Sequence, residues 1–328
     1  MKILITGAAG FTGRYVVEAA LARGHRVRAL YRAESDPSRL GWSRNTELEP
    51  VRMDLREPAG LEAILADVDV VIHLAAVLRG NLESHRRGTI APTESLLSAM
   101  AAASCRRLVL VSSLSVYDYR RIPAFTELDE SSPLEALPEM REPYCWAKLR
   151  QEELARRHAE SEGLIVTTVR PGPIIGPGRI WFDQLGLRIA GPLWARFTAG
   201  GTPVPLTYVE NCAEAIVLAS ERTEAQGGTF NIVDDDLPTR RAYVAALRER
   251  LARRPLVLIV PGAALRSLAR VLAPARGLLG RVPWFLDAAR VDTQLKPLRF
   301  SHARITHALG WRPRYSLGEA LDRSVGSA

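Results

Sequence analysis

Apolar residues in the first half of the chain gather in short runs rich in valine, isoleucine and leucine, and helical patterns separate these runs. Runs of this kind are typical of strands buried on both faces of a parallel sheet. The predicted strands are the apolar run after Lys2, Arg26–Tyr31, Glu49–Met53, Val68–His73, Arg107–Ser112 and Leu164–Arg170. The predicted helices are Phe11–Arg23, Pro58–Ala66, Pro92–Ser104 and Pro143–Ser161. This alternation predicts an α/β fold with a doubly wound parallel sheet.

The first predicted turn carries three glycines, Gly7, Gly10 and Gly13, in the stretch TGAAGFTG. Glycine permits close approach of a ligand to the backbone, and the helix that follows presents free N–H groups to a pyrophosphate. The order of strand, turn and helix therefore predicts a Rossmann-type dinucleotide site. A turn that binds no ligand is the alternative interpretation.

The pattern changes after Arg170, where RPGPIIGPGR (Arg170–Arg179) concentrates proline and glycine. We expect residues 1–170 to form the dinucleotide-binding domain, with return segments at about 210–235. These return segments include a predicted helix at Ala213–Ser220 and a predicted strand at Thr229–Val233. The remaining residues, 171–209 and 236–328, are predicted to form a smaller, mostly carboxy-terminal substrate-binding region.

Residues 255–282 are apolar with arginines at intervals. One interpretation is an amphipathic surface element that faces lipid or an apolar substrate. The favoured interpretation is a packing or lid helix of the substrate-binding region, interrupted at Pro274.

Composition narrows the function classes. The chain has 328 residues, 47% of them apolar, and a formal net charge of +8 that is carried by scattered arginines. Scattered charge is typical of a solvated surface with a weak bias toward anionic ligands, and no nucleic-acid-binding module accompanies it. No secretory leader or stretch long enough to span a bilayer is evident, so we expect a cytoplasmic protein without stable membrane insertion. Three dispersed cysteines fit that location and predict no metal site.

Tyr144 and Lys148 lie four residues apart in YCWAK, so a helix projects both from one face. A neighbouring ammonium lowers the pKa of a phenol from its usual value of about 10. Upstream, VLVSSLSVY (Val109–Tyr117) places serines at the end of a predicted strand, where a hydroxyl can orient a carbonyl or alcohol oxygen. Together with the glycine-rich turn, the pair predicts hydride transfer involving a nicotinamide cofactor. The neighbouring Ser112, Ser115 and His73 are expected to be structural.

Taken in order, seven motifs resemble the extended short-chain dehydrogenase/reductase family, which includes nucleotide-sugar epimerases and 3β-hydroxysteroid-type dehydrogenases. The motifs are TGAAGFTG (Thr6–Gly13), MDL (Met53–Leu55), HLAA (His73–Ala76), SSLSVY (Ser112–Tyr117), YCWAK (Tyr144–Lys148), RPGPIIGPG (Arg170–Gly178) and ALGWRP (Ala308–Pro313). The likeness covers nearly the whole chain. It implies Tyr144 as the proton donor or acceptor, Ser113 as the hydroxyl that aligns the substrate oxygen, and Lys148 as the group that lowers the Tyr144 pKa.

The same resemblance implies that Lys148 also holds the nicotinamide ribose and that Asp54 contacts the adenine. It further implies a homodimer, paired through the helices Pro92–Ser104 and Pro143–Ser161. The candidate cofactor-binding residues are Gly7, Gly10, Phe11, Thr12, Gly13, Arg32, Asp54, Leu55, Leu74, Ala75, Ala76, Lys148 and Pro171.

The cofactor preference is read from the end of the second strand. An acidic residue there holds the ribose 2′-hydroxyl of NAD, whereas an arginine accommodates the 2′-phosphate of NADP. Tyr31 and Arg32 occupy this position, which favours NADP while leaving NAD possible. Arg28 and Arg39 are further candidates for contact with the 2′-phosphate.

The sequence departs from the family pattern at three places that concern the substrate. Leu114 and Ser115 follow Ser113 where family dehydratases carry an Asp-Glu pair, so sugar dehydration is not expected. In PVPLTYVENCA (Pro203–Ala213), Val204 replaces the arginine that binds a nucleotide-sugar diphosphate, and Asn211 replaces an aspartate; Arg179 and Arg290 are possible substitutes. TIAPT (Thr89–Thr93) also lacks the asparagine of the family's Asn-x-x-Gly-Thr.

These observations favour an NADP-preferring oxidoreductase that interconverts a secondary alcohol and a ketone, with a substrate less anionic than a nucleotide sugar. The alternative is an NAD(P)-dependent sugar epimerase, which returns the hydride to the other face. A non-catalytic dinucleotide sensor is a third interpretation, which the simultaneous presence of Tyr144, Lys148 and Ser113 disfavours.

Overall fold

Seven parallel strands form the central sheet of the computed structural model, which describes residues 1–32, 45–198, 201–272, 291–293 and 295–326. Their order in space is β12, β7, β5, β4, β1, β2 and β3. The strands are β1 (Lys2–Thr6), β2 (Arg26–Tyr31), β3 (Leu48–Arg52), β4 (Val70–His73), β5 (Arg107–Val111), β7 (Ile165–Pro171) and β12 (Thr229–Ile232). The order reverses between β1 and β4, which is the point where doubly wound sheets bind ligands at their carboxyl edge. The predicted α/β fold is confirmed.

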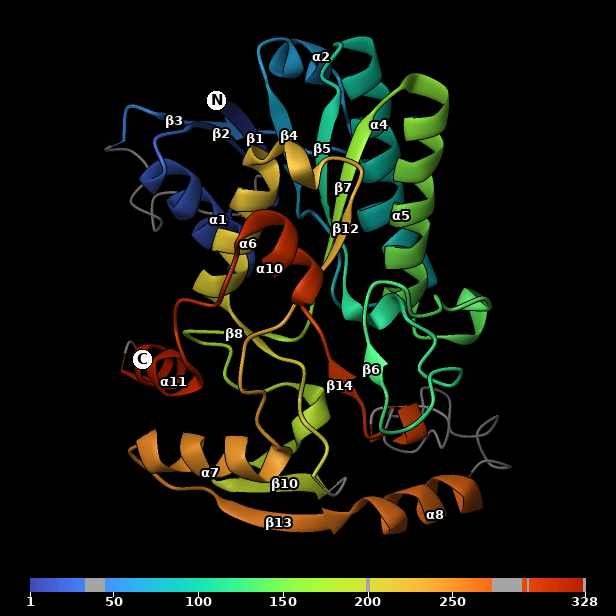
Figure 1. Ribbon diagram of the computed structural model, residues 1–328, viewed down its shortest axis with the longest axis vertical. Helices are drawn as coiled ribbons and strands as arrows, with labels where there is room; N and C mark the ends of the chain where they lie inside the picture. The colour runs from blue at the N-terminus through green and yellow to red at the C-terminus, as the bar shows by residue number, and fades with distance from the viewer. Residues whose placement is uncertain (33–44, 199–200, 273–290, 294, 327–328) are drawn as a thin grey trace.

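Helices cover both faces of this sheet, as Figure 1 shows. Apolar residues of α1 (Phe11–Ala22), α6 (Val209–Glu221) and α10 (Ala303–Leu309) form one core with the strands. Apolar residues of α2 (Leu61–Leu65), α4 (Ala91–Ala102) and α5 (Pro143–Glu162) form the core on the opposite face. The inner strands of the sheet are therefore buried between two helical layers, which explains their nearly continuous apolar sequences, whereas the edge strand β3 is largely exposed.

Two helical segments differ from their predicted bounds. The helix predicted at Pro58–Ala66 is only α2, because Gly60 has φ +84° at its start. The helix predicted at Pro92–Ser104 is preceded by α3 (Leu82–His85) and by a π-helical turn at Arg86–Ile90, which run directly into α4. A π-helical turn is uncommon and is often found at a functional site.

The second region lies at the carboxyl edge of the main sheet, in the lower half of Figure 1. Its three-stranded sheet consists of β9 (Gly186–Ala190), β10 (Leu193–Thr198) and β13 (Leu256–Pro261). Helix α7 (Arg240–Arg250) packs on β10, and α11 (Leu317–Val325) packs on α7. Two short parallel pairs, β8 (Ile174–Ile175) with β11 (Thr207–Tyr208) and β6 (Glu127–Leu128) with β14 (Arg299–Phe300), connect the regions.

The prediction of a helix within residues 255–282 is wrong for the first part of that segment. Residues 256–261 form β13, and α8 (Gly262–Leu272) follows it directly. Proline residues flank the run LVLIV, and its valines and isoleucine favour a strand that pairs with β10. Pro274 and the rest of this segment lie outside the described residues. Within the described ranges, no helix combines the length and apolar character needed to cross a membrane.

Candidate active site

The glycine-rich turn joins β1 to α1 at the carboxyl edge of the sheet. Gly7 has φ +66°, and a Cβ added there would lie 3.0 Å from the Ala75 nitrogen. A Cβ added to Gly13 would lie 2.1 Å from the Gly7 carbonyl oxygen, so a side chain at either position would displace the backbone. Gly10 caps α1 without a side-chain hydrogen bond, which leaves the first-turn N–H groups to a ligand. The turn fits the pyrophosphate of a dinucleotide.

Tyr144 and Lys148 both project from α5 toward the end of β5. The Tyr144 phenol is hydrogen-bonded to the Ser113 hydroxyl, and Ser113 directly precedes a 3-10 turn at Leu114–Val116. Burial raises the pKa of Tyr144, while the Ser113 hydrogen bond and the positive charge of Arg179 lower it. The structure thus brings together the phenol and the serine hydroxyl that the sequence singled out.

Lys148 is buried, with its ammonium 6.0 Å from the centre of the Tyr144 ring. Its Nζ donates to the Val111 carbonyl at 2.8 Å and to Gln151 Oε1 at 2.9 Å. Burial lowers the pKa of Lys148 to about 8, and the nearby Glu152 carboxylate opposes this shift. An ammonium has three N–H donors, so one remains for a ribose or substrate oxygen.

A buried chain of hydrogen bonds behind Lys148 was not expected from the sequence. Gln151 Nε2 donates to Thr93 Oγ1 at 2.7 Å, and Thr93 Oγ1 donates to the Thr89 carbonyl at 2.6 Å. The single hydroxyl proton of Thr93 is used in the bond to Thr89. Thr93 Oγ1 therefore accepts a hydrogen bond from His73 Nε2, which lies 3.0 Å away. Burial lowers the pKa of His73 to about 3, so this imidazole is neutral and its Nδ1 accepts from Thr6 Oγ1 at 2.7 Å. These directions leave only the carbonyl end of Gln151 to face Lys148.

Thr89 stands where the family motif has its asparagine. Its hydroxyl accepts from the Val77 backbone N–H at 2.9 Å and so ties the loop after β4 to the π-helical turn. His85, at the end of α3, is 1% exposed and packs edge-on against Tyr144, with ring centres 6.3 Å apart. Burial lowers the pKa of His85, which keeps its ring neutral beside the phenol. Sequence periodicity offered no signal for either contact.

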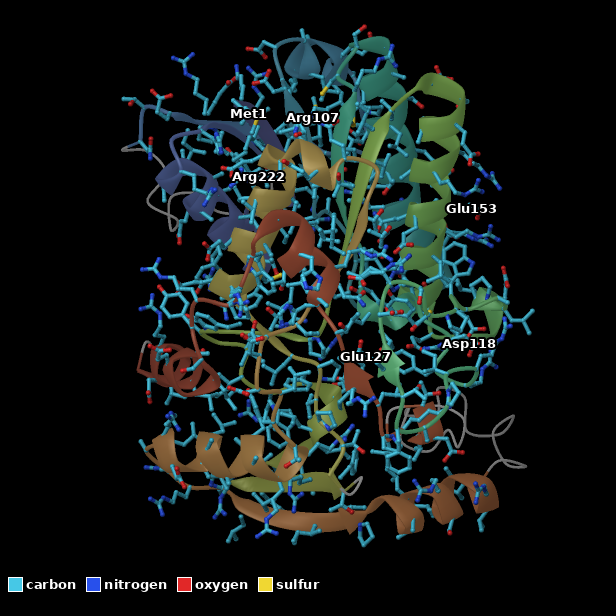
Figure 2. All side chains as sticks on the ribbon, in the orientation of Figure 1. Met1, Arg107, Asp118, Glu127, Glu153 and Arg222 are labelled. Carbon is cyan, nitrogen blue, oxygen red and sulfur yellow. The ribbon has the colours of Figure 1, made fainter. Side chains whose placement is uncertain are left out.

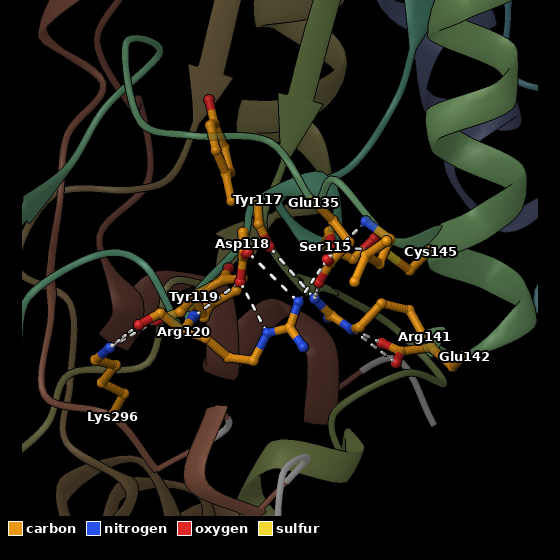
Figure 3. A network of polar contacts seen from close by, with 11 residues as sticks. Ser115, Tyr117, Asp118, Tyr119, Arg120, Glu135, Arg141, Glu142, Cys145 and Lys296 are labelled. Carbon is orange, nitrogen blue, oxygen red and sulfur yellow. Dashed lines mark hydrogen bonds and ion pairs between the residues drawn. The ribbon is translucent and has the colours of Figure 1, made fainter. Parts of the chain in front are cut away.

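A network of ion pairs supports the loop that carries Ser113, as Figure 3 shows. The fully buried carboxylate of Glu135 accepts from Arg120 at 2.6 Å and from Arg141 at 3.0 Å. Arg141 Nη1 also lies 3.5 Å from the Tyr117 carbonyl oxygen, and Cys145 Sγ donates to the Ser115 carbonyl at 3.1 Å. The network therefore joins the loop after β5 to the start of α5, the two segments that supply Ser113 and Tyr144.

The remaining candidate cofactor residues lie along the same edge of the sheet. Leu74, Ala75 and Ala76 follow β4, Pro171 ends β7, and Phe11 and Thr12 begin α1. Leu55 is buried in the core under α2 and α4. Asp54 accepts from Arg56 Nε at 2.9 Å, and this hydrogen bond is the main cause that lowers its pKa, with a smaller effect from Arg32.

Several arginines named as possible helpers are placed elsewhere. Arg28 is buried on β2 and forms ion pairs with Glu49 and Asp67, both at 2.8 Å, which directs it away from a 2′-phosphate. Arg39 and Arg290 lie outside the described residues.

Two residues at the family's diphosphate-binding position are structural. Val204 is fully buried in the second region. Asn211 Oδ1 accepts from the Arg314 and Tyr315 backbone N–H groups, both at 3.0 Å.

The fold and the site together define a nicotinamide-dinucleotide-dependent enzyme of the Rossmann type. The model of the NAD dependent epimerase/dehydratase family matches residues 3–233, and the chain belongs to this family. The resemblance to extended short-chain dehydrogenases/reductases is thereby confirmed, and the chain is an NAD(P)-dependent enzyme of that type.

Relatives of known activity match nearly the whole chain. The chain is 29% identical to 4-hydroxy-2-methyl-3-oxo-4-farnesyl-3,4-dihydroquinoline-1-oxide ketoreductase of Stigmatella aurantiaca, over 94% of both chains. It is 30% identical to dTDP-6-deoxy-L-talose 4-dehydrogenase (NAD(P)(+)) of Kitasatospora kifunensis, over 98% of this chain and 93% of the other. The structure of UDP-glucuronic acid 4-epimerase from Bacillus cereus in complex with NAD aligns over 99% of this chain and 98% of that chain, with a TM-score of 0.76 at 20% identity.

Proposed function

We propose that the protein is an NADP-preferring oxidoreductase that interconverts a secondary alcohol and a ketone. The observation that carries this proposal is the Tyr144 phenol, hydrogen-bonded to Ser113 and one helical turn from the buried Lys148. The cofactor supplies or accepts the hydride when bound. Ser113 orients the substrate oxygen, Tyr144 transfers the proton, and the third N–H of Lys148 holds the ribose.

Ketone reduction is the direction that the Tyr144 environment favours. Burial keeps the pKa of the phenol above its usual value, so the phenol is protonated at neutral pH. A protonated phenol is the form that donates to a carbonyl oxygen as hydride arrives. The similarity to a ketoreductase supports the same direction.

The preference for NADP rests on Arg32, which lies exposed just after β2. The side chain at this position meets the 2′-position of the adenosine ribose, where a guanidinium pairs with a phosphate and a carboxylate repels it. Arg32→Asp should reverse the order of NADPH and NADH affinities in fluorescence titrations. Equal affinities in the unmodified protein would remove this assignment.

The test of the reaction is NADPH oxidation with a panel of ketones and nucleotide sugars, followed by product analysis. Tyr144→Phe should lower turnover by about 10²–10⁴-fold while cofactor affinity stays the same. Tyr315→Phe is the matched control, because Tyr315 lies near α11 and stacks on Arg323 rather than in the site. A sugar isomer formed without net NADPH consumption would instead identify an epimerase, and near-normal turnover of Tyr144→Phe would contradict the proposed acid.

We also propose a homodimer that pairs α4 and α5 with their copies, and a cytoplasmic location. The described helices α4 and α5 pack against each other on one face of the sheet. Cys105, Cys145 and Cys212 are all free and buried, as expected in a reducing compartment. Light scattering that gives a monomer mass at micromolar concentration would contradict the dimer.

A further inference from the structure

Arg179 is held beside the candidate catalytic tyrosine by its own turn. It follows β8, and its backbone exchanges two hydrogen bonds with Gly176, from N–H to carbonyl, at 2.8 and 3.2 Å. Its guanidinium lies 5.3 Å from the centre of the Phe11 ring, within the range of a cation–π contact. Phe11 in turn packs against the core of the second region. The guanidinium is therefore placed in advance on the substrate side of the cofactor turn.

No carboxylate within the described residues forms an ion pair with this guanidinium, and the Asp183 carboxylate acts on it only from a greater distance. Arg179 is half-buried, and neither a hydrogen bond nor an ion pair of its side chain is found in the described part of the chain. Burial lowers the pKa of Arg179, as does the positive charge of Arg79 from the loop after β4, whereas Tyr144 and the Asp183 carboxylate oppose this shift. Arg79 is exposed and, among the described residues, also lacks an ion pair. Two neighbouring guanidinium groups, neither of which forms an ion pair within the described residues, favour an anionic ligand.

The position of these charges limits where the anion lies on the ligand. Arg179 lies against Phe11, the first residue of α1 after the glycine-rich turn, and acts electrostatically on Tyr144, so an anion bound by Arg179 is close to the reacting carbonyl. In family epimerases, an arginine away from the reacting carbon binds the substrate diphosphate. In this chain the fully buried Val204 takes that position. A ligand with its charge near the reacting end fits this distribution better than a nucleoside diphosphate does.

We propose that Arg179, assisted by Arg79, binds an oxyanion of the substrate, a carboxylate or a phosphate, beside the carbonyl that Tyr144 protonates. The inference rests on the proposed function and names its substrate class as anionic oxo compounds. Guanidinium groups pair with both oxyanions in bidentate geometry. The experiment therefore tests a carboxylate substrate and a phosphate substrate separately.

The experiment compares matched charged and neutral carbonyl compounds with NADPH. Acetoacetate is paired with methyl acetoacetate, and dihydroxyacetone phosphate with dihydroxyacetone. At least one charged member should have kcat/KM about 10–100-fold above its neutral partner, the factor expected of one charge-assisted contact. Arg179→Met should abolish that preference and Arg179→Lys should retain part of it. Arg188→Gln should leave it unchanged, because Arg188 makes a similar cation–π contact with Trp194, away from Tyr144.

Two outcomes overturn the inference, and a third refutes the proposed function instead. Equal kcat/KM for charged and neutral partners refutes it while leaving the reductase function intact. A large loss of NADPH affinity in Arg179→Met, with the charged-to-neutral ratio unchanged, assigns the arginine to the cofactor pyrophosphate. If no carbonyl is reduced, the proposed function fails, and calorimetric titration of the NADPH-loaded protein with the same pairs decides the inference separately. Arg79→Gln, a change at an exposed residue, replaces Arg179→Met if that variant does not fold, and it should weaken the same preference.

Discussion

Replacing Gln151 by leucine tests whether the hydrogen-bond chain behind Lys148 sets the charge of that lysine. Gln151 Oε1 accepts from Lys148 Nζ at 2.9 Å, and leucine has a similar volume but no acceptor. A hydrogen bond to a charged group contributes about 1.5–3 kcal/mol, and one pKa unit corresponds to about 1.4 kcal/mol. The pKa of Lys148, already lowered to about 8, should therefore fall by a further one to two units, roughly.

The sign follows from which form of the lysine the amide stabilises. The Gln151 carbonyl stabilises the ammonium, so its removal favours the neutral amine at a lower pH. Glu152 still favours the ammonium, while the neutral His73 has no charge to add. In the unmodified enzyme, cofactor affinity and kcat/KM for reduction should both decline as the pH rises past the pKa of Lys148. In Gln151→Leu the same decline should begin at a pH roughly one to two units lower. The assay is NADPH fluorescence titration beside kcat/KM, measured between about pH 5 and pH 10.

Two variants on the same helix serve as controls. Gln151→Glu keeps the shape and adds a negative charge, so the alkaline limb should move to higher pH. Glu153→Gln should have no effect on the limb, because Glu153 lies on the outer side of α5, as Figure 2 shows, where it pairs with Arg150 at 2.5 Å. A folded Gln151→Leu protein with an unchanged pH profile and unchanged cofactor affinity would refute the reasoning.

Further predictions concern charge and stability. Lys148→Met should weaken NADPH binding and turnover together, in contrast to Tyr144→Phe, and a variant with normal cofactor affinity would contradict the ribose contact. Glu135→Ala should lower the free energy of unfolding by about 1.5–3 kcal/mol in urea titrations, because it removes the buried carboxylate that Arg120 and Arg141 share and leaves Arg141 with Glu142 alone among the described carboxylates. Burial raises the pKa of Asp234 to about 7, so the folded state keeps a proton that the unfolded chain loses near pH 4. Stability from this group should therefore fall by up to about 4 kcal/mol as pH rises from about 4 to 7, and Asp234→Asn should flatten that slope in unfolding curves.

Most elements around the main sheet were predictable because each has a local signal. The strand predicted at Arg26–Tyr31 has those bounds in β2, and the helix predicted at Pro143–Ser161 ends one residue later in α5. The proline at the start of α5 and the glycine after it mark both ends locally. The second region was harder to predict. Residues 256–261 form an apolar run that suits a helix or a strand, and its pairing partner β10 lies about sixty residues earlier in the chain.

In the candidate site, too, some residues were indicated by local signals and others depend on tertiary packing. Spacing alone placed Tyr144 and Lys148 on one face of a helix, and the strand end placed Ser113 nearby; their catalytic roles remain predictions. Gln151 carried no such signal, because its function depends on Thr93 of α4 and His73 of β4 meeting α5 inside the molecule. The same holds for Arg28, whose position on β2 suggested a phosphate contact, although two carboxylates occupy it in the folded chain.

The main sheet, the dinucleotide turn and the family could be predicted from local patterns, because they depend on periodicity and on closely spaced glycines in one turn. The charge of the site depends instead on how distant segments pack. The pKa values of Lys148 and Tyr144 depend on burial, and the pKa of Arg179 depends on burial and on the charges around it, Arg79 and Asp183 among them. Burial and the distance between charges are properties of packed segments that are far apart along the chain, and no local pattern encodes them.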